Sequence, residues 1–578
     1  MSRLAFFMVL AGATAACTGY VGGKDTPYGA GPNGGDPTTS AGSSGTGPGT
    51  GTQTTTDPNQ PPTAQVTCAA NAAETVGHRV LRRLTNGELE ATMRAVFGFD
   101  SAAWPGVSLP SDTGSLDGFT NNVDSLTVSP DYAKGTFDGA KKLAALISAD
   151  AQLTKLAPCA AKADAACADT FVTSLGAKLY RRPLSATEKA RYTALYTKIS
   201  AKEDFKSFAY WASIAMLQSP SLIYRSEVGE ADGANRFKLT AYEVATQLAY
   251  TFSGGPPSDA LIQLAASNQL STADQIEAAA RTLVFDGTSV KPAFREVLLH
   301  FTDQWLGLEG FSNIKKDSAL YPDFSSDVQA SMEEETRRFF SAIFLEDKGN
   351  VGALFTAPYT FVDSTLAKYY GFGSATGTDF VRVTRPANWG LGLLGQGSLL
   401  STQANSLSTS PTRRGHLVRT KLLCGVVPPP PPVVGPIPAP TATQTTRQRY
   451  EELHEANPSC AGCHTMMDRI GFSLEHLDAA GRYRETENSY PIDDSGSVTG
   501  TSKGDLKVTG PAELATTISQ LPEVTDCVSS YLGGYALGLN HDSAACLVSN
   551  AASELRSGGS LLDFYVHIAR SEHFRSRQ

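Results

Sequence analysis

The sequence lacks several features that mark common classes of protein. It has no block of basic residues, and its formal net charge of -9 argues against a nucleic-acid surface. After the N-terminal segment, no hydrophobic run is long enough to cross a bilayer as a helix. Only one Cys-x-x-Cys pair is present, so the two pairs of a four-cysteine zinc site are missing. We therefore expect no nucleic-acid partner and no permanent membrane span.

The first residues resemble an export signal. Met1-Ser2-Arg3 is followed by a mostly apolar or small segment, residues 4–16, and then by Cys17. This pattern predicts a signal peptide at 1–16 and a lipid-modified Cys17 as the first mature residue, which would anchor a lipoprotein in the outer membrane, in the periplasm or at the cell surface. The usual leucine three positions before the cysteine is absent, so ordinary cleavage between Ala13 and Ala16 is the alternative.

Residues 17–67 have hardly any large apolar side chains. Glycine, serine, threonine and proline dominate, and such a composition cannot bury enough surface to fold. We predict a disordered tether that holds the folded part away from the membrane.

The remaining chain is too long for one hydrophobic core, and its apolar residues recur mainly at helical spacing. One example is the segment 80–99, in which Thr85 and Glu88 form a capping-box pattern. Extended segments are few, at residues 359–362 and 380–383. We predict a mainly α, multi-domain protein with short β segments, divided into modules at 68–158, 159–225, 226–375, 376–487 and 488–578.

The chemistry-bearing motif is Cys460-Ala461-Gly462-Cys463-His464. This spacing attaches a c-type haem through Cys460 and Cys463, and the histidine that follows supplies an imidazole ligand to the iron. We predict one covalent haem c with His464 as its proximal ligand. Two alternatives stay open, a Cys460–Cys463 disulfide and half of a zinc site completed by distant ligands.

The second axial ligand is less evident, because no methionine follows Met467. On a helix, Met467 lies on the same side as His464, so it cannot reach the far face of the haem and is expected to be a core residue. We favour His567, within the apolar run 561–568, as a second metal ligand, which gives either bis-histidine ligation or an open iron. Other candidates are His476, His541, His573, Met93, Met216, Met332 and His416.

Six cysteines remain after lipid and haem attachment, an even number that suggests disulfides in an exported chain. Cys159 and Cys167 flank a short alanine-rich segment, and Cys527 and Cys546 flank a helix-like stretch, so both are expected to form local bridges. Cys68 and Cys424 then pair by elimination.

An acidic run at residues 332–338 contains three consecutive glutamates followed by two arginines. Paired carboxylates can serve acid–base chemistry, but on a helix such a run more often forms a solvated face with i,i+4 ion pairs. We expect the solvated face.

A set of motifs distributed along the chain resembles the modular, domain-of-unknown-function proteins called planctomycete-type cytochrome-like proteins, which also occur in myxobacteria. The motifs lie at residues 82–88, 180–184, 217–225, 239–243, 359–371, 410–415, 460–475 and 571–575. The resemblance implies an exported, haem-attaching protein without an assigned reaction. The separate cytochrome module of some relatives is replaced here by the tether.

Three functions are consistent with these features. The first is electron transfer between the haem and a redox partner protein. The second is a haem-dependent oxidoreductase or peroxidase, which needs an open iron position. The third is a non-redox surface scaffold that binds a partner or a glycan and is stabilised by disulfides.

Replacing Cys17 tests the lipid anchor. The wild-type protein should fractionate with membranes, and Cys17→Ala should move it to the soluble fraction, because the acylated side chain is gone. A wild-type protein that is already soluble after export would show simple signal cleavage instead.

Overall fold

The computed structural model describes residues 76–99, 109–233, 235–373, 375–428, 439–456 and 458–578. Every described residue belongs to one compact unit of the chain. The predicted signal peptide, the tether, Cys17 and Cys68 lie outside the described residues. Within these ranges, the helices are all too short or too polar to traverse a bilayer.

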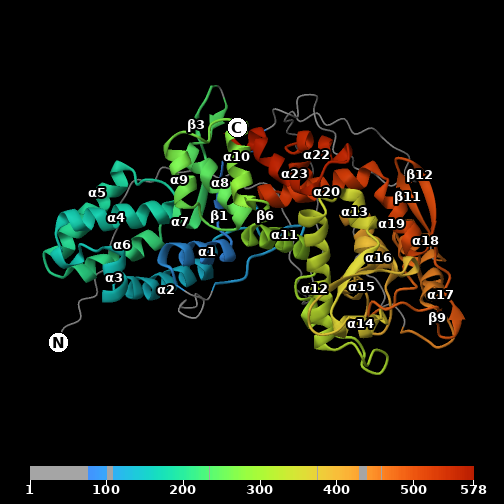
Figure 1. The fold of residues 1–578 in the computed structure, drawn as a ribbon. Helices are drawn as coiled ribbons and strands as arrows, with labels where there is room; N and C mark the ends of the chain where they lie inside the picture. Colours follow the sequence, from blue (N-terminus) through green and yellow to red (C-terminus); the bar gives the residue numbers. More distant parts are fainter. Residues whose placement is uncertain (1–75, 100–108, 234, 374, 429–438, 457) are drawn as a thin grey trace, which may run out of the picture. The chain divides into compact units, whose positions relative to one another are not determined.

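The described chain is mainly α, as predicted, and its strands are short (Figure 1). The first group of helices packs around one hydrophobic core that runs from Met93 to Leu222. This core crosses the predicted module boundary between residues 158 and 159, so the two modules share their interior. The helices are α1 (Asn86–Phe97), α2 (Pro130–Ile147), α3 (Asp150–Leu156), η2 (Ala160–Lys162), α4 (Ala165–Tyr180), α5 (Ala186–Ser200), α6 (Phe205–Leu217) and α7 (Pro220–Ile223).

The predicted helix starts are confirmed where a capping box was recognised. The Thr85 hydroxyl accepts the backbone N–H of Glu88, whose carboxylate accepts the N–H of Thr85 in return. The residues before Thr85 differ from the prediction, because Val80–Arg83 form strand β1 rather than helix. β1 pairs antiparallel with β2 (Tyr224–Glu227), which supplies partners for backbone groups that a helix would have satisfied internally.

Most helices of the following segment contribute to a second, larger core that also contains residues close to the C-terminus. They are α8 (Ala241–Ser253), α9 (Asp259–Ala266), α10 (Ala273–Val284), α11 (Pro292–Trp305), η3 (Phe311–Asn313), α12 (Ser326–Ser341), η4 (Ala342–Glu346), α13 (Val351–Thr356), α14 (Ser364–Tyr370), η5 (Ala387–Trp389), η6 (Gly392–Gly395) and α15 (Gly397–Thr402). A small third core lies between η3, α12, β7 and α14.

The last group of helices surrounds the Cys-x-x-Cys-His segment and continues to the C-terminus. They are α16 (Pro411–Leu417), η7 (Val418–Leu422), α17 (Thr446–Tyr450), η8 (Glu451–Glu455), α18 (Pro458–Phe472), α19 (Gly510–Ser519), α20 (Pro522–Leu537), α21 (His541–Ala545), α22 (Ser549–Arg556), α23 (Leu561–His567), η9 (Ile568–Arg570) and η10 (Glu572–Phe574). The second core joins this group to α8–α13, so the predicted boundaries at 375 and 487 do not separate independent interiors.

The described strands form small antiparallel pairs and one three-stranded sheet, in the order β13-β4-β3. Both predicted extended segments are strands that pair with each other, β7 (Tyr359–Val362) with β8 (Val381–Thr384). The remaining strands are β3 (Glu230–Ala231), β4 (Phe237–Lys238), β5 (Phe285–Asp286), β6 (Ser289–Val290), β9 (Thr486–Glu487), β10 (Tyr490–Pro491), β11 (Ser495–Thr501), β12 (Gly504–Thr509) and β13 (Ser576–Arg577).

The acidic run on α12 is only partly a solvated face. Glu334 pairs with Arg338 at i,i+4, as expected, but Glu335 is fully buried. Its carboxylate accepts hydrogen bonds from Arg385 at 2.6 Å and from the hydroxyl of Tyr370 at 2.8 Å. Burial raises the pKa of Glu335, and these partners oppose the rise. The prediction was wrong for Glu335, which forms a buried ion pair with Arg385.

One of the predicted disulfides is present, and the structure corrects the pairing of the others. Cys159 and Cys167 are bonded, as expected. Cys424 is bonded to Cys527, across 103 residues, so the predicted Cys527–Cys546 and Cys68–Cys424 pairs are wrong. The reason is that Cys527 is buried on the face of α20 that packs against η7, and Cys424 follows η7 directly. Cys546 is also disulfide-bonded.

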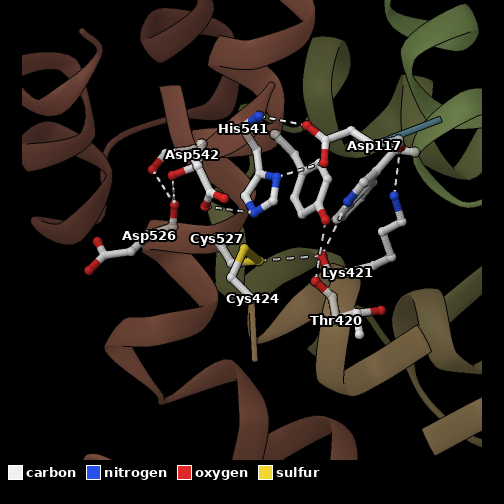
Figure 2. Close-up of a disulfide and its surroundings, with 12 residues drawn as sticks. Asp117, Thr420, Lys421, Cys424, Asp526, Cys527, His541 and Asp542 are labelled. Atoms are coloured by element: carbon white, nitrogen blue, oxygen red, sulfur yellow. Dashed lines mark hydrogen bonds and ion pairs between the residues drawn. A yellow bond between two sulfur atoms is a disulfide. The ribbon is translucent and has the colours of Figure 1, made fainter. Parts of the chain in front are cut away.

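The surroundings of this long-range disulfide contain one of the predicted histidines (Figure 2). The His541 ring stacks on Tyr531, and its Nδ1 lies 2.7 Å from the Asp117 carboxylate. The Lys421 ammonium donates to the Asp117 carbonyl at 2.6 Å. The disulfide therefore joins α20 to the residues that follow η7, near the point where Asp117 contacts Lys421 of η7 and His541 of α21.

Removing each disulfide should have effects that differ with the length of the loop it closes. Chain-entropy arithmetic gives about 4.7 kcal/mol for Cys424→Ser/Cys527→Ser and about 2.5 kcal/mol for Cys159→Ser/Cys167→Ser. Denaturant unfolding of both double variants and the wild type checks the order. Equal losses in the two variants would contradict it.

Candidate functional site

The Cys-x-x-Cys-His segment occupies the first turns of α18, and α16 packs directly against that helix (Figure 1). A Cβ atom at Gly415 would overlap the Met467 carbonyl, and one at Gly471 would overlap the Pro411 backbone. Both positions therefore require glycine, because any larger residue would force the two helices apart.

A buried arginine fixes the segment that follows α18. The Arg414 guanidinium donates to the carbonyls of Leu474 at 2.9 Å, Leu477 at 2.6 Å and Asp478 at 2.8 Å. It also lies 3.9 Å from the buried Glu475 carboxylate. α16 thus positions α18 by close backbone contact at Met467 and Gly471, and it holds the segment after α18 by hydrogen bonds.

A second histidine, His454, lies next to His464 of the Cys-x-x-Cys-His motif. His454 lies in the π-helical turn η8, just before α18, and it is buried. Its ring stacks on the His464 ring with centroids 3.6 Å apart and a tilt of 34°, while Tyr450 packs edge-on at 5.1 Å. Single π-helical turns are frequent at functional sites.

Asp468 joins the two histidines. Its side chain is fully buried, and Oδ2 lies 2.6 Å from His454 Nδ1 and 3.4 Å from His464 Nδ1. Oδ1 accepts a hydrogen bond from the Thr412 hydroxyl at 2.5 Å. Together, His454, His464 and Asp468 place ligand-type atoms within 4.8 Å of one another.

The electrostatics of Asp468 favour the ionised carboxylate. Burial alone would raise its pKa, but hydrogen bonds from His454, His464 and Thr412 outweigh burial and hold the pKa below its usual range. The site therefore offers a fixed negative charge to both imidazole rings.

Cys460 and Cys463 are both free thiols and partly exposed. The other five cysteines of the described chain are all disulfide-bonded. A Cβ atom at Gly462, between the two thiols, would meet nothing within 4 Å, so that side of the motif is open. The described motif is not a disulfide, and its thiols remain available for covalent attachment or metal binding.

The structure does not bring His567, the predicted second ligand, to the motif. Its ring lies 3.5 Å from the Glu277 carboxylate of α10 and also contacts Glu554 of α22. The apolar run around it faces the core, but His567 itself is the last residue of α23 and pairs with carboxylates. The prediction that His567 points into a core was wrong, because its side chain is partly exposed and pairs with two carboxylates.

The other candidate ligands also have different neighbours. His573 is buried beside Arg577 and accepts the Gly77 N–H, His541 pairs with Asp117, and His476 stacks on Tyr483. Met93 and Met216 lie in the first core and Met332 in the third. Met467 is buried, as expected for a core residue. Of these candidates, His416 alone belongs to a helix that packs on α18 among the described residues, and it is exposed.

Sequence reasoning missed His454 and gave no role to Asp468. Asp468 was detectable, because a residue four positions after His464 on a helix shares its face. His454 was harder to find, since its ring in η8 contacts His464 of α18 across ten positions of sequence, and no helical spacing predicts such a contact.

Four family models match the chain, and each is described as a protein of unknown function. They are PSD3 (DUF1587) at residues 82–149, PSD5 (DUF1595) at 167–227, PSD4 (DUF1592) at 239–372 and PSCyt3 (DUF1588) at 391–487. The Cys-x-x-Cys-His site lies within the region that the PSCyt3 model matches. No curated protein and no solved structure matches the chain.

Removing the Asp468 carboxylate should destabilise the fold. In Asp468→Ala the buried His454 Nδ1–H and the Thr412 hydroxyl lose their acceptor, which costs about 2–3 kcal/mol of unfolding free energy. The matched control is Glu455→Ala, which removes a partly exposed ion pair with Arg469 and should cost less than about 1 kcal/mol. Similar losses in both variants, measured by denaturant unfolding, would show that the Asp468 network contributes little.

Proposed function

We propose that the chain is an exported c-type haem protein that transfers electrons to or from a partner protein, and that it is anchored to the outer membrane by a lipid on Cys17. The observation that carries the haem assignment is the pair of free thiols on α18, beside an imidazole, in a chain whose other described cysteines are oxidised. The PSCyt3 name points in the same direction.

The donor set fits a haem. Cys460 and Cys463 would form the two thioether links, and His464 would bind the iron. His464 Nδ1 faces the Asp468 carboxylate, so Nε2 is the nitrogen left for the metal. Bound here, the haem would supply a one-electron centre.

Asp468 and His454 would tune the proximal side of this centre. A carboxylate that accepts the second N–H of a metal-binding histidine fixes the ring and makes the ligand more basic. His454 would share the Asp468 carboxylate with His464 and pack against its ring, which would help to hold the imidazole in place.

A second candidate function is a haem-dependent oxidoreductase. It is favoured by the placement of the predicted far-side ligands, because His567, His573, His541 and His476 all contact other parts of the described chain. Without such a ligand, the sixth iron position would be open to a small oxidant or substrate. The coordination number distinguishes the two functions.

Protein exported together with a haem-attachment system tests the assignment. The wild type should give a c-type pyridine haemochrome spectrum, and Cys460→Ser/Cys463→Ser should abolish it, because no thioether can form. Cys159→Ser/Cys167→Ser, which removes a different cysteine pair, should keep the spectrum.

A wild-type protein that contains zinc, or no cofactor, would overturn the haem assignment.

In the haem-loaded protein, a low-spin spectrum insensitive to cyanide would support electron transfer with two protein ligands. A high-spin spectrum that shifts with cyanide would support the oxidoreductase. A band near 695 nm, roughly the marker of histidine/methionine ligation, would contradict both ligand sets expected here.

A further inference from the structure

A cavity of about 450 Å³ lies apart from the Cys-x-x-Cys-His segment, and three separate sequence motifs line it. The motifs at residues 180–184, 217–225 and 239–243 contribute Arg182, Tyr224, Tyr242 and Glu243 to its wall. The volume falls in the range of about 300–1,000 Å³ found for small-molecule sites. None of these motifs has a role in the proposed haem site.

The wall is built by hydrogen bonds to backbone groups. Arg181, in a left-handed conformation at the end of α4, donates to the carbonyls of Ser221 at 2.9 Å, Leu222 at 3.1 Å and Tyr224 at 2.7 Å. This buried guanidinium holds the start of β2 against the turn between α4 and α5. The cavity is therefore formed in advance, before any ligand arrives.

The charges in the wall already have partners. Arg182 and Glu188 form a bidentate pair with distances of 2.8 and 2.9 Å. Glu243 accepts the Ser226 hydroxyl at 2.8 Å, the Val228 N–H at 2.9 Å and the Thr240 N–H at 2.9 Å. A charged ligand would have to break one of these interactions, so the cavity favours a neutral one.

The groups left for a ligand are aromatic rings with hydroxyls. Tyr224 and Tyr242 are half-buried in the wall, and neither phenol hydroxyl forms a hydrogen bond with another described residue. Leu81, which also lines the cavity, is 56% exposed. Tyrosine offers a rigid apolar face and a polar tip at low entropic cost, which suits a ligand that is apolar on its ring faces and rich in hydroxyls at its edges.

We propose that this cavity binds a neutral oligosaccharide, with Tyr242 and Tyr224 packing on sugar rings and the wall hydroxyls and the Arg182–Glu188 pair bonding to sugar hydroxyls. The inference is independent of haem, since no cavity residue belongs to α16–α18. It assigns ligand recognition to the part of the chain before residue 247, and redox chemistry to α18.

Calorimetric titration of the full-length mature protein with cellohexaose, xylohexaose, mannohexaose and maltohexaose tests the proposal. At least one hexaose should bind, and Tyr242→Ala should weaken it by about tenfold or more, which corresponds to about 1.4 kcal/mol. Tyr242→Phe keeps the ring and should lose less. Tyr490→Ala, at a 44% exposed tyrosine on β10, is the matched control and should leave binding unchanged.

Two further titrations test whether sugar binding is independent of the haem segment and whether the cavity prefers a neutral ligand. Cys460→Ser/Cys463→Ser should bind the sugar as the wild type does, whether or not the haem assignment holds. Hexagalacturonate, a charged probe of similar length, should bind at least about tenfold more weakly than the best neutral hexaose. Absence of binding by all four neutral hexaoses at millimolar concentration, unchanged binding in Tyr242→Ala, or preference for the charged probe would overturn the proposal.

Discussion

The close packing of α16 against α18 is the constraint on which the site depends. Glycines at 415 and 471 let the two helix backbones touch, and that contact brings Thr412 of α16 to the Asp468 carboxylate of α18. Asp468 in turn engages His454 and His464. A side chain at either glycine would separate the helices and remove the shared acceptor, although it would touch neither thiol nor imidazole.

Much of the fold was predictable, because it depends on local patterns. Capping boxes such as Thr85 with Glu88 mark helix starts by hydrogen bonds between residues three apart, and these signals are fully contained in the sequence. The failures came from contacts between distant segments. Val80–Arg83 became a strand because β2 pairs with it, and Glu335 was buried because Arg385 and Tyr370 reach it from other elements. Periodicity contains no information about such partners.

In the candidate site too, the sequence predicts what depends on local spacing and misses what depends on contacts between distant segments. Spacing alone identified Cys460, Cys463 and His464, since the attachment chemistry fixes their separation. The neighbours of the motif could not be derived in that way, because the contact between His454 of η8 and His464 of α18 follows no fixed spacing in the sequence. His567 was selected for its apolar surroundings, but it sits at a helix end among carboxylates. A hydrophobic run predicts which elements are buried, and it does not predict where a single polar side chain within the run will point.

The disulfide between Cys424 and Cys527 has a consequence for the order in which the chain must mature. Cys460 and Cys463 lie between the two bonded cysteines, so during synthesis both appear before the correct partner of Cys424 does. Loop-closure entropy favours the nearer thiols, and a bond from Cys424 to either of them would trap the chain with Cys527 unpaired. Correct maturation thus requires that the two motif thiols be kept reduced, or already be covalently occupied, while their neighbours oxidise.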